Sequence, residues 1–327
     1  MRNQALDIMK AIGIILVIIG HNTSGIAYHY IYSFHMPMFF IIAGYLWKVR
    51  SIGQSLKHDL KRILAPYLVY LSIVAIVDCI CSGLSFGRIE QNALKMIWGS
   101  VMNVDVFGHH VQGVGYIWFL PALYVCKNVF NALYIVWWKV QNTTFSRLGL
   151  GVCVFVCMFA GVMIHKYLFP LPFAITTGLN ALGFFSIGYL LKVWLKDIEI
   201  LNKVARWYKL FIMVVYASLG WYTLNGMGTC DYSILPLDYV AGITGTVICF
   251  YVSQWLCFST KYISKAMQII GQYTISILII HQFIAAYAWV LHIENTNHNL
   301  LISLTIGVAL MYVFIHYTIS KIVTRNQ

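Results

Sequence analysis

"KAIGIILVIIGHNTSGIAYHYIYSFHMPMFFIIAGYLWK" spans residues 10–48 and decides the fold. It consists of two apolar runs, each of which holds a histidine and has a lysine at its far end. Runs of roughly 15–23 apolar residues are long enough to cross a bilayer as helices. Imidazoles are costly to place inside such runs, so their presence is typical of a polar site within a membrane protein.

The composition of the whole chain agrees with a membrane protein. Of its 327 residues, 60% are hydrophobic and 10% are charged, whereas a soluble domain carries about 25% charged residues. We expect an all-α integral membrane protein of about ten transmembrane helices, with a single domain over residues 1–327. The first helix is expected to be retained rather than cleaved as a leader. The expected spans lie near residues 11–29, 31–47, 63–84, 116–138, 148–164, 173–191, 210–224, 240–258, 267–291 and 300–319.

The basic charge predicts the orientation in the membrane. The formal net charge is +12, and Lys and Arg gather in segments such as 48–62 and 192–209. With a cytoplasmic N-terminus these segments face the cytoplasm, as the positive-inside rule requires. We therefore expect both termini to be cytoplasmic, and we expect membrane lipids but no nucleic acid among the partners.

The ionisable residues of the first two spans form a pattern. Lys10 and His21 are three helical turns apart, so they project from one helix face about 16 Å apart along the axis. Asp7 lies one turn before Lys10. Because the second span runs back, His35 is expected at the depth of His21, and Pro37 is expected to bend the helix after it. The sequence therefore predicts two imidazoles at one level above a basic cytoplasmic mouth.

Other interpretations of the buried polar residues stay open. The two histidines either take part in catalysis, or hydrogen-bond between helices and do nothing else, or bind a metal ion. A metal site is disfavoured, and we expect none, because no intramembrane Cys–His or carboxylate spacing accompanies them. His281 shares a helix face with Thr274 and either bonds a neighbouring helix or takes part in catalysis. Lys127 is expected to pair with Asp78 or to extend along its helix toward water.

Five stretches resemble the membrane-bound acyltransferase-3 family, and they span most of the chain. They are similar to its basic-x10-His pattern, His-Met-Pro signature, Arg-x3-Pro element, Trp-Phe-Leu element and Gly-x2-Ser-x6-His region. The stretches are "LDIMKAIGIILVIIGH" (6–21), "FHMPMFFIIAGYLW" (34–47), "KRILAPYLVY" (61–70), "YIWFLPALY" (116–124) and "IGQYTISILIIH" (270–281). Lys10 stands where arginine is commoner in the family, and Thr274 where serine is usual. The first stretch is most similar to the exopolysaccharide and fucose O-acetylase branch.

The resemblance implies an enzyme of the bacterial cytoplasmic (inner) membrane, an O-acyltransferase without a bound cofactor. It is expected to move an acetyl group from cytoplasmic acetyl-CoA to a hydroxyl of a surface polysaccharide or its lipid-linked sugar precursor. His21 is expected to act as general base, and His35 to orient the acceptor or stabilise the oxyanion. The other implied residues either bind the donor phosphates (Lys10, Lys61 and Arg62) or support the site (Asp7, Trp118, Phe119, Thr274 and His281).

Lengths along the first helix support this interpretation. An extended pantetheine arm is about as long as the rise from Lys10 to His21, roughly 16 Å. A thioester whose CoA phosphates lie at Lys10 therefore reaches the level of the histidines. Direct transfer and a covalent acyl-histidine relay both stay open, as does the choice between acetyl and succinyl.

The alternative class is a polytopic transporter or exporter of a glycan in which the membrane histidines relay protons. Such a protein more often shows an inverted repeat and helices broken by Gly or Pro in matching halves, and we expect neither. Transport without consumption of acyl-CoA distinguishes the two classes. A structural scaffold leaves the paired histidines unexplained.

Overall fold

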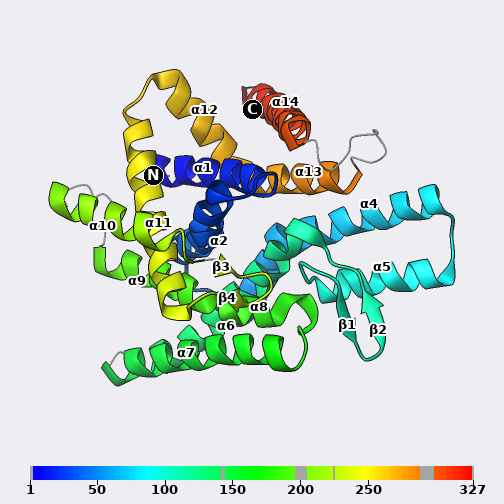
Figure 1. The fold of residues 1–327 in the computed structure, drawn as a ribbon, viewed down its shortest axis with the longest axis horizontal. Helices are drawn as coiled ribbons and strands as arrows, with labels where there is room; N and C mark the ends of the chain where they lie inside the picture. Colours follow the sequence, from blue (N-terminus) through cyan, green and yellow to red (C-terminus); the bar gives the residue numbers. More distant parts are fainter. Residues whose placement is uncertain (1–2, 141–143, 196–204, 224, 288–297, 326–327) are drawn as a thin grey trace. The chain divides into compact units, whose positions relative to one another are not determined.

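The structure is a computed structural model that describes residues 3–140, 144–195, 205–223, 225–287 and 298–325. The described chain is mostly helical and forms two compact units (Figure 1). Unit 1 comprises Met1–Phe39, Asn202–Asn225 and Ser233–Gln327, and unit 2 comprises Phe40–Leu201 and Gly226–Tyr232. The expected all-α architecture is confirmed for these residues apart from two short hairpins, and the single domain stays a prediction.

Unit 1 is organised around its first helix. Its helices are α1 (Gln4–Gly20), the first part of α2 (Ile26–Leu46), α10 (Arg206–Leu219), α11 (Leu235–Cys257), α12 (Lys261–Gln272), α13 (Thr274–Tyr287) and α14 (His298–Arg325). α1 packs against α11, α12, α13 and α14. It is hydrophobic on nearly every face, which is typical of a central helix that neighbours surround.

Two glycines let the helices of unit 1 approach closely. A Cβ atom at Gly20 would lie 2.8 Å from Cγ2 of Ile31, so α1 and α2 come together near the end of α1. A Cβ atom at Gly271 would lie 1.8 Å from the backbone oxygen of Asp7, so α12 is in backbone contact with the start of α1. Any larger residue at Gly271 must push α12 away from α1.

Unit 2 holds most of the remaining elements. They are α3 (Ile52–Asp59), a π-helical turn η1 (Leu60–Leu64), α4 (Ala65–Ser82), α5 (Phe86–Trp98), η2 (Gly115–Trp118), α6 (Phe119–Val140), α7 (Thr144–Tyr167), η3 (Pro172–Ala174), α8 (Ile175–Asn180) and α9 (Leu182–Leu195). α6 packs against α7, α8 and α9 and also against α3 and η1. α4 and α5 lie side by side as an antiparallel pair (Figure 1).

The two hairpins occur in connections between helices. β1 (Val104–Val106) pairs with β2 (His109–Val111) in the α5–α6 connection, with Asp105 opposite His110. β3 (Asn225–Gly226) pairs with β4 (Asp231–Tyr232) in the connection between α10 and α11. Neither hairpin is long enough to alter the helical class of the protein.

The lengths and hydropathy of the helices identify a multi-pass membrane protein. In the described ranges, five helices are long and apolar enough to cross a membrane, or up to seven if each of two bent pairs is one span. The five are Ile52–Ser82, Gly115–Trp137, Ser146–Tyr167, Leu235–Cys257 and Asn299–Thr318. They correspond to the spans expected near 63–84, 116–138, 148–164, 240–258 and 300–319. The count of ten and the cytoplasmic termini stay predictions.

The bent pairs correct the expectation of unbroken helices. In unit 2, Pro172–Asn180 and Leu182–Leu195 meet at 53°, and in unit 1, Lys261–Gln272 and Thr274–Tyr287 meet at 72°. The residues at the breaks, Ala181 and Tyr273, are neither Gly nor Pro, so the sequence lacked the usual signal. The two bent pairs correspond to the spans expected near 173–191 and 267–291. Residues 288–291 of the second span lie outside the described residues.

The expected bounds of the first span are wrong. The sequence predicted residues 11–29, whereas α1 begins at Gln4 and ends at Gly20, with His21 as its C-terminal cap. The reason is local. The side-chain Nδ2 of Asn22 donates a hydrogen bond to the Ile18 oxygen at 2.8 Å, and the backbone N–H of Asn22 donates to the Ile19 oxygen. These bonds satisfy carbonyls at the helix end, and the chain then turns toward α2. Similarly, α10 is Arg206–Leu219, where residues 210–224 were expected.

Candidate active site

Three histidines from three helices of unit 1 lie together. Nδ1 of His21, at the end of α1, is 3.1 Å from Nε2 of His281 in α13, and the two rings stack with centroids 5.4 Å apart. The ring of His35 in α2 lies with its centroid 6.4 Å from that of His21. The structure therefore brings together the two histidines that the sequence predicted at one level and adds His281 as a hydrogen-bond partner.

The three imidazoles differ in their access to solvent. His35 and His281 are 1% and 2% exposed, whereas His21 is half-buried. His21 therefore keeps more accessible surface than the two residues whose rings surround it. Among the residues that the structure describes, no group of three or more His, Cys, Asp and Glu side chains could hold a metal ion, this trio included.

The hydrogen-bond partners decide where the protons of these rings lie. Nδ1 of His35 is 2.8 Å from the backbone oxygen of Ile31. A carbonyl oxygen only accepts, so Nδ1 carries the proton and Nε2 of the neutral ring holds a lone pair. For His21, donation from its Nδ1 to Nε2 of His281 leaves a lone pair on its own Nε2, and the reverse donation leaves a proton there. The first arrangement makes His21 a base.

The opposite end of α1 carries an ion pair. Nζ of Lys10 is 2.7 Å from Oδ1 of Asp7, and the two side chains are 19% and 6% exposed. Their approach confirms the predicted placement of both residues near one helix face. An ammonium group has three donors, so Lys10 can bind an anion while it stays paired with Asp7.

The other predicted residues lie elsewhere. Thr274 is the first residue of α13 and follows the break at Tyr273, on the same helix as His281. Lys61 and Arg62 belong to unit 2, where both are exposed on the π-helical turn η1. Trp118 and Phe119 are also in unit 2 and are buried, and the ring of Phe119 packs edge-on against Phe40 with centroids 5.2 Å apart.

The structure corrects the expected partner of Lys127. Its Nζ is 2.7 Å from Oδ1 of Asp59 rather than near Asp78, which accepts a hydrogen bond from Asn92 at 3.2 Å. Asp59 is 1% exposed and also lies 2.9 Å from Nδ1 of His58. The ion pair joins α6 to the last residue of α3, directly before the turn that carries the predicted donor-binding cations.

Sequence reasoning did not single out Tyr32. Its ring centroid lies 4.8 Å from that of His35 and 6.0 Å from that of His21. It stands in the aromatic segment "YHYIYSF" (28–34), where composition alone does not distinguish one tyrosine from the next. The spacing of three residues to His35 was the available signal, since residues three apart share a helix face.

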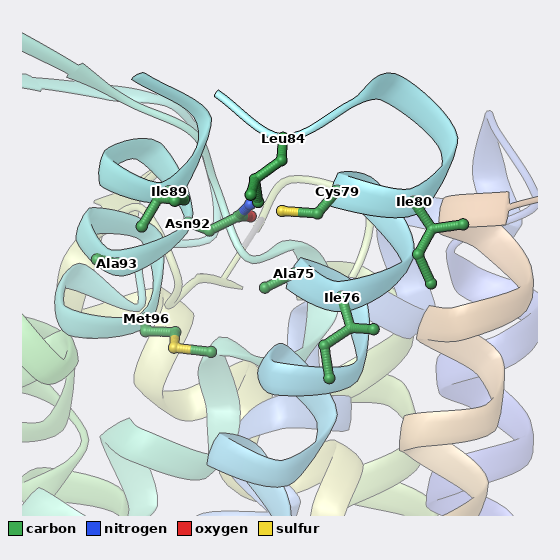
Figure 2. A pocket seen from close by; sticks show the side chains of 9 residues that line it. All are labelled: Ala75, Ile76, Cys79, Ile80, Leu84, Ile89, Asn92, Ala93 and Met96. Carbon is green, nitrogen blue, oxygen red and sulfur yellow. The ribbon is translucent and has the colours of Figure 1, made fainter. Parts of the chain in front are cut away.

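Two further features of unit 2 do not belong to the histidine cluster. A pocket of about 450 Å³ lies between α4 and α5 (Figure 2), and its lining is almost wholly apolar. It contains none of the predicted site residues; its lining is Ala75, Ile76, Cys79, Ile80, Leu84, Ile89, Asn92, Ala93 and Met96. Burial raises the pKa of the Cys230 thiol to about 12, which disfavours its thiolate, the nucleophilic form.

Comparison with known proteins gives one match. A family model described as an acyltransferase domain matches residues 3–319, nearly the whole chain. No curated protein and no solved structure matches the chain. The matched range includes every residue that the sequence placed in the site.

Proposed function

Because the chain belongs to the acyltransferase-3 family, we propose that this multi-pass membrane protein is an O-acetyltransferase of the bacterial cytoplasmic membrane. It takes the acetyl group from cytoplasmic acetyl-CoA and transfers it to a hydroxyl of a surface polysaccharide or its lipid-linked sugar precursor. Acetyl-CoA is a substrate, and no resident cofactor takes part. Within the family, the first stretch (6–21) supports the exopolysaccharide and fucose O-acetylase branch.

The donor binds along α1 in this proposal. The ammonium group of Lys10 attracts the phosphates of CoA, and its pairing with Asp7 holds it in place. The pantetheine arm follows the helix for about three turns, roughly 16 Å, and presents the thioester at His21. Lys61 and Arg62 are proposed as further phosphate-binding residues, because their exposed side chains offer an ammonium group and a guanidinium fork.

His21 removes the proton of the acceptor. With its Nδ1 proton donated to His281, Nε2 takes the proton of the attacking hydroxyl while the oxygen forms a bond to the thioester carbon. The C–S bond then breaks, and the CoA thiolate receives the proton from the His21 imidazolium. His281 stabilises that imidazolium by accepting its Nδ1 hydrogen bond, and the ester and free CoA are the products.

The hydrogen bond of His35 favours one of its two expected roles. Since Nδ1 of His35 donates to Ile31, the neutral ring presents only an acceptor at Nε2. An acceptor nitrogen can orient the hydroxyl of the sugar, whereas an oxyanion requires a donor. We therefore assign His35 to orientation of the acceptor.

The single observation that carries this proposal is the contact between Nδ1 of His21 and Nε2 of His281, at 3.1 Å. The second imidazole orients that of His21, which caps α1 eleven residues after Lys10. A base oriented by a second group is the arrangement that acyl transfer requires.

The transport alternative has one observation in its favour. Each unit contains a bent helix pair, and discontinuous helices are common at the binding sites of secondary transporters. A transporter differs from the proposed enzyme because it moves its substrate without consuming acyl-CoA.

Incubation of the purified wild-type protein with labelled acetyl-CoA and lipid-linked glycans distinguishes acetyl transfer from transport. We expect free CoA to appear together with an equal amount of acetyl ester on the glycan. Reconstitution into vesicles supplies the second arm of the test. Uptake or export of the glycan without release of CoA would establish transport and reject the proposed activity.

A further inference from the structure

A row of aromatic rings extends from the histidine cluster along α2. Tyr28, Tyr32 and His35 follow at intervals of four and three residues, which places them on one face of the helix. The ring centroids of Tyr28 and Tyr32 are 4.0 Å apart with the planes tilted by 32°, and Tyr32 lies 4.8 Å from His35. Because Tyr32 is also 6.0 Å from His21, the row ends at the proposed base.

No described residue covers the other end of the row, at residues 24–27. Residues 24–27, which precede it, are exposed, and Tyr28 and Tyr32 are half-buried. The neighbouring faces of α2 are different, since Ile31 and Phe34 are each 8% exposed and Ser33 is fully buried. The two tyrosines therefore keep accessible surface, whereas Ile31 packs against Gly20 of α1 and Phe34 against Gly245 of α11.

We propose that Tyr28 and Tyr32 form a subsite for one pyranose ring of the acceptor. A pyranose presents C–H groups on its faces and hydroxyls at its rim. Aromatic faces carry partial negative charge and attract the C–H groups, while a phenol hydroxyl can donate to or accept from the rim. Two tyrosines in a half-open row match both chemistries, whereas a row of phenylalanines would match only the first.

The position of the subsite separates the two substrates. The row meets His21 at the C-terminal end of α1, and Lys10 lies three turns earlier toward the N-terminal end. A sugar held by Tyr28 and Tyr32 presents its hydroxyl to His21 without passing the phosphates of the donor. This inference rests on the proposed acetyl transfer, because it gives the acceptor of that reaction its binding residues.

Binding of simple sugars tests the subsite without any need for activity. The full-length protein, in a detergent without a sugar head group, is mixed with methyl glucopyranoside or methyl galactopyranoside, and saturation-transfer difference NMR reports contact with the ring protons. Sorbitol serves as an acyclic polyol. We expect transfer to the pyranoside C–H groups, reduced about fivefold by Tyr28→Leu or Tyr32→Leu. The phenylalanine variants should reduce it less, because they keep the aromatic face and lose only the hydroxyl. Tyr222→Leu is the matched control, since Tyr222 is 72% exposed in the same unit.

A kinetic arm uses lipid-linked glycans and acetyl-CoA. Tyr28→Leu is expected to raise KM for the glycan about fivefold and to leave KM for acetyl-CoA unchanged. The subsite is rejected if wild-type protein gives no pyranoside signal, if sorbitol gives an equal signal, or if the leucine variants match the wild type. Failure of acetyl transfer by the wild type rejects the enzyme activity instead, and the binding arm still decides whether a sugar lies on these rings.

Discussion

Nδ1 of His21 lies 3.1 Å from Nε2 of His281, although 260 residues separate them in the chain. His21 caps α1 and His281 lies in α13, and these two helices pack against each other. The contact gives His21 a fixed orientation and a partner for its Nδ1 proton. In the proposed mechanism this pairing makes His21 the general base and joins the last motif of the chain to the first.

Replacing His281 should slow the chemical step and leave substrate binding intact. We expect His281→Leu to lower kcat about a hundredfold, because the tautomer of His21 that exposes a lone pair at Nε2 loses its partner. His281→Gln should recover part of that loss, since an amide oxygen can accept the Nδ1 proton. Steady-state kinetics on both variants check this. Wild-type kcat in His281→Leu would show that the contact only holds the helices together.

Replacing Lys10 should weaken binding of the donor. Lys10→Ala is expected to raise KM for acetyl-CoA about tenfold with a smaller effect on kcat, because a charge-assisted contact to phosphate is lost. Lys10→Arg should bind like the wild type. Lys265→Ala is the matched control, an exposed lysine of the same unit. An equal effect of both alanine variants would show that the net positive charge of the protein, rather than Lys10 itself, attracts the donor.

A side chain at Gly271 should separate α12 from α1. A Cβ atom there would meet the Asp7 oxygen at 1.8 Å, and no side-chain movement can relieve a clash with backbone. Gly271→Ala is expected to destabilise the fold by about 2 kcal/mol and to lower the transfer rate. Gly307→Ala in α14 is the matched control, because a Cβ atom there meets nothing within 4 Å. Thermal unfolding in detergent compares the two, and equal midpoints would contradict the close packing.

The Asp59–Lys127 pair should respond asymmetrically to single and double replacement. Lys127→Leu leaves the carboxylate of Asp59 buried without its lysine and is expected to cost about 3 kcal/mol of stability. The double variant Asp59→Leu/Lys127→Leu should regain most of that loss. Lys166→Leu, at an exposed lysine of the same unit, should have no effect. A double variant less stable than Lys127→Leu would show that the ion pair is not the source of the cost.

The parts of the site that the sequence predicted are local in the chain. Lys10 and Asp7 share a helix face through the ordinary period of the helix. His21 and His35 meet because α2 follows α1 directly and Gly20 lets the two helices approach. Both relations depend on fewer than forty neighbouring residues, so periodicity and connection length were sufficient.

The sequence predicted that His281 either bonds a neighbouring helix or takes part in catalysis, and its bond to α1 agrees with the first. The partners that were not predicted, His21 for His281 and Asp59 for Lys127, depend on distant contacts or on irregular backbone. His281 reaches His21 only because α12 lies against α1 at Gly271 and α13 then turns by 72° at Tyr273, a break without Gly or Pro. Lys127 pairs with Asp59 next to a π-helical turn, where the ordinary helical period no longer predicts which residues share a face. Neither relation leaves a signal in a single sequence.

The role of His21 is tested most directly by the rate at which His21→Ala transfers labelled acetyl from acetyl-CoA to a lipid-linked glycan. The variant must first show the thermal midpoint of the wild type, so that a lost fold is not mistaken for lost chemistry. We expect a rate about a hundredfold or more below that of the wild type, because the proposed general base is gone. A transfer rate equal to that of the wild type would contradict it.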